Sequence, residues 1–185
     1  MNVVLIISSV RDTRMAGDVL VKVKSLIDLT YDITVVDPLD YQLPLLNKRY
    51  YEMDDPEPVF KKLHEIFNGA DGFMILSAEY NHGIPPALKN MLDHYGKEFR
   101  HKCCGIVSYS DGSVGGARAT EQLRLVCSTL GMPPVSLSPT WGLANKYKEP
   151  EGRSFYENFE RQFKSFLKEF DWYLNALYNH RQLQK

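Results

Sequence analysis

Three short segments of this chain are rich in side chains that bind anions or planar ligands. The first reads Ser8-Ser9-Val10-Arg11-Asp12-Thr13-Arg14 and combines hydroxyl and guanidinium groups. At the start of a helix, such groups add to unpaired backbone N–H donors and the positive end of the helix dipole, an arrangement that suits a phosphate. The segment has no glycine-rich NTPase loop, so nucleotide hydrolysis is not indicated. On this segment alone, an ordinary capped helix with solvated arginines remains an equal alternative.

The second segment covers residues 77–86 and mixes polar and aromatic side chains. Tyr80 is suited to stack beside a planar ring, and Asn81 can donate to a ring nitrogen or carbonyl. Glu79 has three possible roles, as a ligand-binding group, a carboxylate at a helix start or a subunit contact. His82 is a candidate acid, although a histidine in a polar loop more often only forms hydrogen bonds.

The third segment covers residues 108–118 and contains Gly112, Gly115 and Gly116. Glycine allows close backbone approach to a planar ligand and adopts positive φ without strain. Glycine-rich turns after strands are common, so this segment gains meaning only beside the other two.

Alternating strand and helix patterns determine where these segments lie. Continuous apolar runs predict buried strands, and apolar residues at helical spacing predict the helices between them. Residues 38–56 contain three prolines and are expected to be irregular. A polar tail after residue 180 is expected to fray. The predicted strands are 3–7, 33–36, 72–77, 103–109 and 135–137, and the predicted helices are 15–29, 57–68, 84–95, 117–130 and 153–179.

This alternation predicts an α/β fold, a doubly wound five-stranded parallel sheet with helices on both faces. The expected strand order is the flavodoxin-like 2-1-3-4-5, in one domain over residues 1–185. Ligands on such sheets bind beyond the carboxyl ends of the strands. The loops 8–16, 77–85 and 109–117 should therefore meet at one edge of the sheet.

Composition excludes several other classes of function. The formal net charge of -1, from 22 basic and 23 acidic residues, gives no basic field for nucleic acid. No apolar run approaches the roughly 18 residues of a membrane span, and no signal peptide is evident. Cys103, Cys104 and Cys127 lack metal-ligand spacing and are expected to be reduced core thiols of a cytoplasmic protein. Adjacent Cys103 and Cys104 should point to opposite faces of their strand.

Taken together, the three segments resemble the NADPH-dependent FMN reductase family, which includes flavin-dependent quinone, azo-dye and chromate reductases. That family shows Gly-Ser-x-Arg in its first loop, Pro-Glu-Tyr-Asn followed by His-Gly and Pro in its second, and Ser-Tyr-Gly with a later Gly-Gly-x-Arg-Ala in its third. The resemblance covers residues 2–138. The matching stretches are Ser8–Arg11, Ala78–Pro85, Leu88–Asp93, Ser108–Ala119 and Gln122–Arg124.

The resemblance implies an FMN site and a set of residues that form it. Ser9, Arg11 and Arg14 with the loop backbone would hold the phosphate. The residues lining the isoalloxazine would be Glu79, Tyr80 and Asn81, and those bordering its other edge Ser110, Gly112 and Gly115. The implied assembly is a homodimer or homotetramer, with Tyr80 and Arg118 near the partner subunit.

Three departures from the family pattern stand out. Ser8 replaces a glycine, and its side chain either narrows the phosphate loop or points outward. Ala78 replaces a proline, which frees φ and adds a backbone N–H. Ser110-Asp111 replaces a glycine and brings a negative charge near either the ring or the path of the nicotinamide.

The implied activity is electron transfer from NADPH or NADH through FMN to a small oxidant such as a quinone or free flavin. FMN carries the redox chemistry, so no protein group is assigned as catalytic and no metal is required. Cations for the extra phosphate of NADPH include Arg11, Arg14, Lys48 and Arg49. Two alternatives remain, a non-catalytic FMN-binding carrier or redox-sensing module, and a descendant that has lost flavin.

Overall fold

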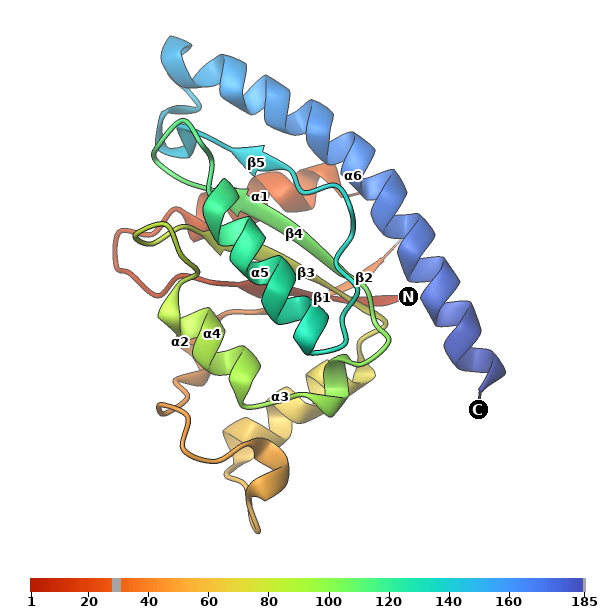
Figure 1. Cartoon of the computed structure of the whole chain (residues 1–185). Coiled ribbons are helices and arrows are strands. Elements are labelled where there is room, and N and C mark those ends of the chain that lie inside the picture. Colours follow the sequence, from red (N-terminus) through yellow and green to blue (C-terminus); the bar gives the residue numbers. More distant parts are fainter. Residues whose placement is uncertain (28–30, 185) are drawn as a thin grey trace.

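The computed structural model describes residues 1–27 and 31–184 and contains one five-stranded sheet. All four strand pairs are parallel, and the order is β2-β1-β3-β4-β5 (Figure 1). The predicted flavodoxin-like order is therefore confirmed. The strands are β1 (Asn2–Ile7), β2 (Asp32–Val36), β3 (Gly72–Ala78), β4 (Cys104–Tyr109) and β5 (Thr140–Trp141).

Helices cover both faces of the sheet, as Figure 1 shows. The predicted helices are confirmed with shifts of a few residues at their ends, and residues 28 and 29 of the first prediction lie outside the described residues. The α-helices are α1 (Ala16–Leu26), α2 (Pro38–Tyr41), α3 (Pro58–Gly69), α4 (Pro86–Asp93), α5 (Ala117–Thr129) and α6 (Pro150–Leu183), and the 3-10 helices are η1 (Tyr50–Glu52), η2 (Lys97–Phe99) and η3 (Ala144–Lys146).

The core consists of two apolar clusters separated by the sheet. On one face the strands pack against α1 and α6, and on the other they pack against α3, α4 and α5. Strands β3 and β4 are buried along their whole length, which explains their continuous apolar sequences. Cys103 belongs to the first cluster and Cys104 to the second, so the prediction that they face opposite sides is confirmed.

The expected irregular stretch at 38–56 was partly wrong, because it contains α2 and η1. Asp37 caps α2 by accepting a hydrogen bond from the Leu39 N–H, and Pro38 occupies the first turn. Proline suits that position because its fixed φ is helical and no N–H is needed there. Four residues of helix are too few to leave a periodic apolar pattern.

The predicted fifth strand at 135–137 was wrong, because β5 lies three residues further on. Residues 133–135 make only an isolated bridge to the start of β4. The Arg124 guanidinium then donates hydrogen bonds to the carbonyls of Val135 and Ser136, at 3.2 and 2.8 Å. Pairing with β4 resumes at Pro139, whose carbonyl accepts a hydrogen bond of 3.0 Å from the Ser108 N–H.

Helix α6 is longer than predicted and runs through Leu183, so the expected fraying after residue 180 was wrong within the described residues. The Arg181 guanidinium donates to the carbonyls of His101 and Asp71, at 2.6 and 2.9 Å. These bonds attach the last turns of α6 to the amino-terminal end of the sheet.

Candidate functional site

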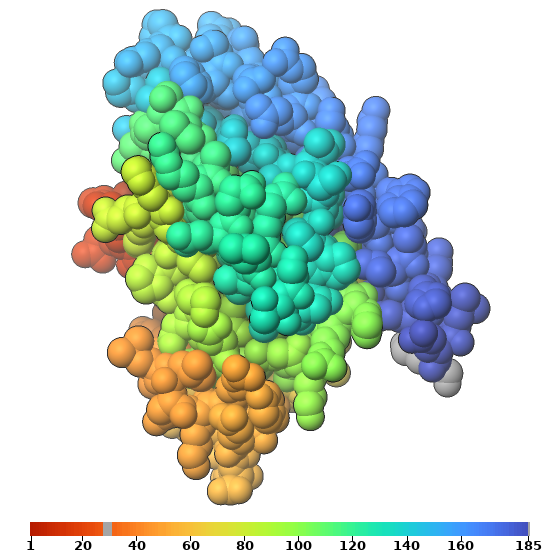
Figure 2. Space-filling view, in the orientation of Figure 1, coloured from red at the N-terminus to blue at the C-terminus, as the bar shows by residue number. Residues whose placement is uncertain are grey.

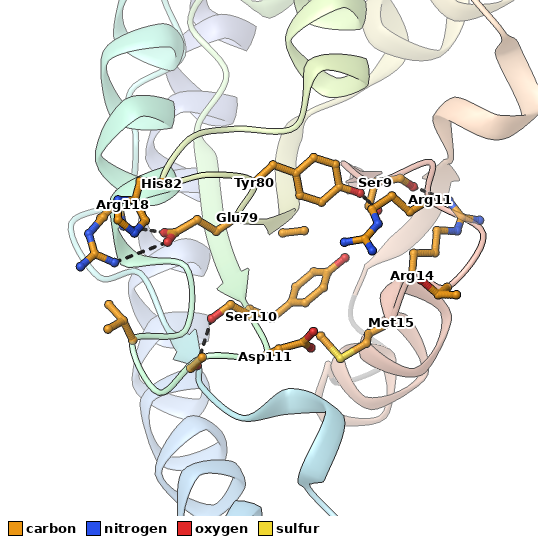
Figure 3. Close-up of a pocket in the computed structure, with 15 residues that line it drawn as sticks. Ser9, Arg11, Arg14, Met15, Glu79, Tyr80, His82, Ser110, Asp111 and Arg118 are labelled. Carbon is orange, nitrogen blue, oxygen red and sulfur yellow. Dashed lines mark hydrogen bonds and ion pairs between the residues drawn. The ribbon is translucent and has the colours of Figure 1, made fainter.

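The three predicted loops meet beyond the carboxyl ends of β1, β3 and β4 and enclose a pocket of about 320 Å³. Figure 2 shows the first two loops, in red and yellow-green, adjoining at one edge of the molecular surface, and Figure 3 shows the pocket between all three. The prediction that the loops converge is confirmed. The lining residues are Ser9, Arg11, Thr13, Arg14, Met15, Ala78, Glu79, Tyr80, His82, Tyr109, Ser110, Asp111, Gly112, Val114 and Arg118.

Ser9 and Tyr80 join the first loop to the second. Ser9 is buried, and its hydroxyl forms a hydrogen bond with the Tyr80 hydroxyl. The Arg11 guanidinium carbon lies 5.9 Å from the centre of the Tyr80 ring, and Figure 3 shows this side chain reaching into the pocket. One aromatic ring and one exposed cation therefore stand side by side at the pocket wall.

Arg14 lies in the same loop, but its guanidinium is committed to protein groups. It donates to both carboxylate oxygens of Asp37, at 2.7 and 2.6 Å, and to the Ser9 carbonyl at 2.6 Å. The hydrogen bond to Asp37 raises the pKa of Arg14, although burial opposes this. Burial would raise the pKa of Asp37, but the bonds from Arg14 and from the Leu39 N–H lower it overall.

The start of α1 completes a donor set that fits a phosphate. Met15 caps this helix without any side-chain hydrogen bond, so its first N–H groups are not satisfied by a capping side chain. The Arg11 guanidinium and the hydroxyls of Ser9 and Thr13 line the same pocket. Cationic and N–H donors at a helix start suit an oxyanion, so these residues fit the phosphate of FMN.

The second loop is a tight hairpin. The backbone N–H groups of Tyr80 and Gly83 donate to each other's carbonyls at 2.9 Å, and Asn81 and His82 between them have φ of 49° and 64°. Left-handed conformations cost energy for residues with a Cβ. His82 lines the pocket, whereas the exposed Asn81 is not among the lining residues.

Glu79 takes one of its three predicted roles, the carboxylate at a helix start. It accepts hydrogen bonds from the N–H groups of Arg118 and Ala119, at 3.0 and 3.2 Å, in the first turn of α5. The Arg118 guanidinium lies 3.6 Å from the same carboxylate (Figure 3). The contact links the second loop to the third.

In the third loop, Ser110, Asp111 and Gly112 line the pocket. The Ser110 hydroxyl donates to the Gly112 carbonyl at 3.0 Å, which closes the turn. Gly115 does not line the pocket. It has φ of +67°, and a Cβ there would lie 2.8 Å from the Gly142 nitrogen, so this glycine is required for loop packing.

Ser8 points neither outward nor into the phosphate loop. It is fully buried, and its hydroxyl accepts a hydrogen bond of 2.8 Å from the Ala78 N–H. Two departures from the family pattern thus meet in one hydrogen bond, which ties the carboxyl ends of β1 and β3 together.

Sequence reasoning assigned no role to Tyr109, which lines the pocket, or to Asp37, which lies outside the pocket and binds Arg14. Tyr109 is buried at the end of β4 and lines the pocket, and burial raises the pKa of its phenol. The position of Tyr109 at the carboxyl end of an apolar strand would have been sufficient to identify it. Asp37 follows β2, whose loop was not among the three considered. Of the cations considered for NADPH, Arg49 lies outside the pocket and donates to the Tyr51 hydroxyl.

The described residues contain no group of His, Cys, Asp and Glu able to hold a metal ion. Within the same residues, no helix is long and apolar enough to cross a membrane. All three cysteines are free and buried, and burial raises the pKa of Cys103 to about 12. These thiols are therefore core groups, as predicted.

Known proteins resemble this chain in sequence and in fold. A quinone reductase of Pseudomonas putida is 28% identical over 68% of this chain and 74% of its own length. An NAD(P)H-dependent FMN reductase of Saccharomyces cerevisiae is 32% identical over 71% of this chain and 76% of its own. The flavoenzyme NAD(P)H:(acceptor) oxidoreductase FerB from Paracoccus denitrificans superposes with a TM-score of 0.76, at 17% identity, covering 93% of this chain and 98% of that one.

The family model described as NADPH-dependent FMN reductase matches residues 1–146, which include all three pocket loops. In the structure, these three loops meet at the edge of a flavodoxin-like sheet. The chain belongs to the NADPH-dependent FMN reductase family.

Proposed function

We propose that this chain is an FMN-dependent NAD(P)H oxidoreductase whose flavin binds in the pocket between the three loops. The observation that carries the proposal is the donor set at the start of α1, next to an aromatic wall, in a chain of this family. When bound, FMN supplies the redox chemistry, taking hydride from NAD(P)H and passing electrons to a small oxidant.

Each loop has a separate task in this proposal. Ser9, Arg11 and the loop backbone bind the phosphate. Arg14 lies in the same loop, but its guanidinium binds Asp37 and the Ser9 carbonyl. The hairpin presents Tyr80 beside the ring system, with Glu79 directly before it and Asn81 in the turn. Ser110 and Gly112 border the other edge of the ring, and Gly115 shapes that loop. The Ser9–Tyr80 hydrogen bond keeps the phosphate end and the ring end of the pocket in register.

The oxidant is a small molecule, and a quinone or a free flavin is the proposed type. The similarity to a quinone reductase supports this choice. A pocket that is open to solvent and that requires no protein nucleophile would admit a range of oxidants. Asp111, exposed at the pocket rim, would disfavour anionic ones by repulsion.

The proposal extends to assembly and location. We propose a homodimer or homotetramer with Arg118 and Tyr80 near the subunit contact, and a cytoplasmic location. Three unpaired core cysteines support a reducing compartment. Sedimentation of the purified protein tests the assembly independently of the chemistry.

Two half-reactions followed by absorbance test the activity. Protein reconstituted with FMN and freed of excess should show flavin bands that bleach anaerobically on adding NADPH or NADH. A quinone added afterwards should restore the bands. FMN that is retained but inert to both nicotinamides would instead indicate a carrier or a redox-sensing module.

A further inference from the structure

We propose that Asp37 is a positioning residue of the flavin-phosphate site, acting through Arg14 on the loop between Ser8 and Arg14. The inference rests on the proposed FMN site and adds a residue outside its three loops. Asp37 does not line the pocket, so its action on the phosphate is indirect.

The geometry is that of a strut between two elements. Arg14 spans from the Asp37 carboxylate, at the end of β2, to the Ser9 carbonyl, at the end of β1. A planar guanidinium that binds both carboxylate oxygens has a fixed orientation. The bond to the Ser9 carbonyl therefore fixes the direction of the peptide group between Ser9 and Val10, within the phosphate loop.

The carboxylate is itself held in place. Its Oδ1 accepts a hydrogen bond of 3.0 Å from the Leu39 N–H, as the cap of α2. The Arg14 and Asp37 side chains are only 19% and 15% exposed, so water and salt screen the pair less than they screen a surface pair. Helix α2 thereby supports the phosphate loop from outside the pocket.

Charge balance gives a second reason for the pair. An unpaired Asp37 carboxylate beside the loop would repel a phosphate, and Arg14 neutralises it. Arg11 in contrast makes no ion pair within the described residues, and its guanidinium lies in the pocket. The two arginines thus divide their work, with Arg11 facing the ligand and Arg14 bracing the loop.

The test compares FMN with riboflavin, which lacks the phosphate, in Asp37→Asn, Arg14→Met and the double variant. Dissociation constants are read from quenching of flavin fluorescence. Asp37→Asn should weaken FMN binding about tenfold, the value of one charge-assisted hydrogen bond, and change riboflavin binding less than about twofold. Arg14→Met should weaken FMN binding more, because it leaves the carboxylate unpaired. Adding Asp37→Asn to Arg14→Met should then recover part of the affinity.

A readout without flavin follows the loop itself. Hydrogen exchange of the amides of residues 10–14 should accelerate in flavin-free Asp37→Asn, while the melting temperature falls by only roughly 2–4 °C. Asp55→Asn is the matched control, since it breaks an ion pair of 2.7 Å with Lys61 outside the pocket. It should leave FMN affinity and loop exchange unchanged. Should Asp37→Asn not fold, Asp37→Glu retains the charge and should bind FMN within a few-fold of the parent protein.

Two results would overturn the inference. First, Arg14→Met could weaken FMN binding by the same factor in the parent protein and in the Asp37→Asn variant. Arg14 would then be a direct ligand of the phosphate. Second, tighter FMN binding by Asp37→Asn would show that the carboxylate competes for Arg14. Failure of the proposed function is a different result, because then the unmodified protein itself would bind FMN no better than riboflavin.

Discussion

At the scale of single residues, Ser8 and Ala78 form a pair that neither residue would suggest alone. The Ala78 N–H is buried, and the Ser8 hydroxyl is its acceptor. Ser8→Gly should reduce the free energy of unfolding by about 2 kcal/mol, because the N–H is left unsatisfied. Denaturant unfolding measures the loss.

The same bond predicts non-additivity. Ala78→Pro removes the N–H and presses the ring against Ser8, so it should be destabilising alone and tolerated better with Ser8→Gly. A coupling energy of about 1 kcal/mol or more is expected from the double-mutant cycle. Strictly additive changes would mean that the hydrogen bond contributes nothing.

The lowered pKa of Asp37 predicts that the free energy of unfolding depends on pH. Its pKa is lower in the folded protein than the ordinary 3.8, so its ion pair with Arg14 stabilises the fold above 3.8 and is lost as pH falls further. At neutral pH, Asp37→Asn should be less stable than the parent by about 1 kcal/mol. The difference should be constant between pH 5 and 7 (roughly) and shrink below about pH 4. A difference that grew at low pH would contradict this sign.

Most residue types of the candidate site could be predicted from the sequence, but not all of their roles. Ser9, Arg11 and Tyr80 lie in the pocket because they follow strands that end at one edge. The role of Glu79 could not be predicted from the sequence, since the two N–H groups that it caps at the start of α5 lie 39 and 40 residues further along the chain. The role of Arg14 could not be predicted either, because its partner Asp37 lies 23 residues further along the chain, directly after β2.

At the scale of elements, the hairpin at Asn81 and His82 stores local strain. His82→Gly should raise the free energy of unfolding by about 1 kcal/mol, because glycine adopts φ of +64° freely and suits the second position of such a turn. His101→Gly is the matched control, with φ of +61° outside the pocket. Both variants should be stabilised, as thermal unfolding will show. Only a chemical role for His82 would make turnover fall in the first variant alone.

The third loop packs closely against the backbone of Gly142 at Gly115. Gly115→Ala should cost more than about 2 kcal/mol, because it combines a positive φ with a Cβ 2.8 Å from the Gly142 backbone. Gly69→Ala, at the end of α3 with nothing within 4 Å, should change stability by less than about 1 kcal/mol. A Gly115→Ala variant as stable as the parent protein would show that packing against Gly142 does not require a glycine at this position.

Strands and helices with strong apolar periodicity were predictable, and those set by specific polar contacts were not. The continuous apolar sequences of β1, β3 and β4 predict that these strands are buried, and they are. Strand β5 is only two residues long, and the carbonyls of Val135 and Ser136 before it accept hydrogen bonds from the Arg124 side chain. The short helix α2 depends on a cap and a proline rather than on periodicity.

At the scale of the whole molecule, α1 and the long helix α6 cover one face of the sheet, and α3, α4 and α5 cover the other. The pocket lies at the carboxyl edge of this sheet. Helix α6 places Phe166 against β4 so closely that a Cβ at Gly105 would lie 2.5 Å from its ring. The strand order and the two-faced core followed from the alternation of elements. The attachment of the last turns of α6 by Arg181 did not, because it depends on contacts with distant carbonyls.

The central claim is that this pocket binds FMN through its phosphate as well as its ring. The most direct measurement is a titration of the flavin-free protein with FMN and with riboflavin. We expect one FMN per chain and an affinity for FMN about a hundredfold higher than for riboflavin, the value of two charge-assisted hydrogen bonds. Equal affinities for the two flavins, or no retention of either, would contradict it.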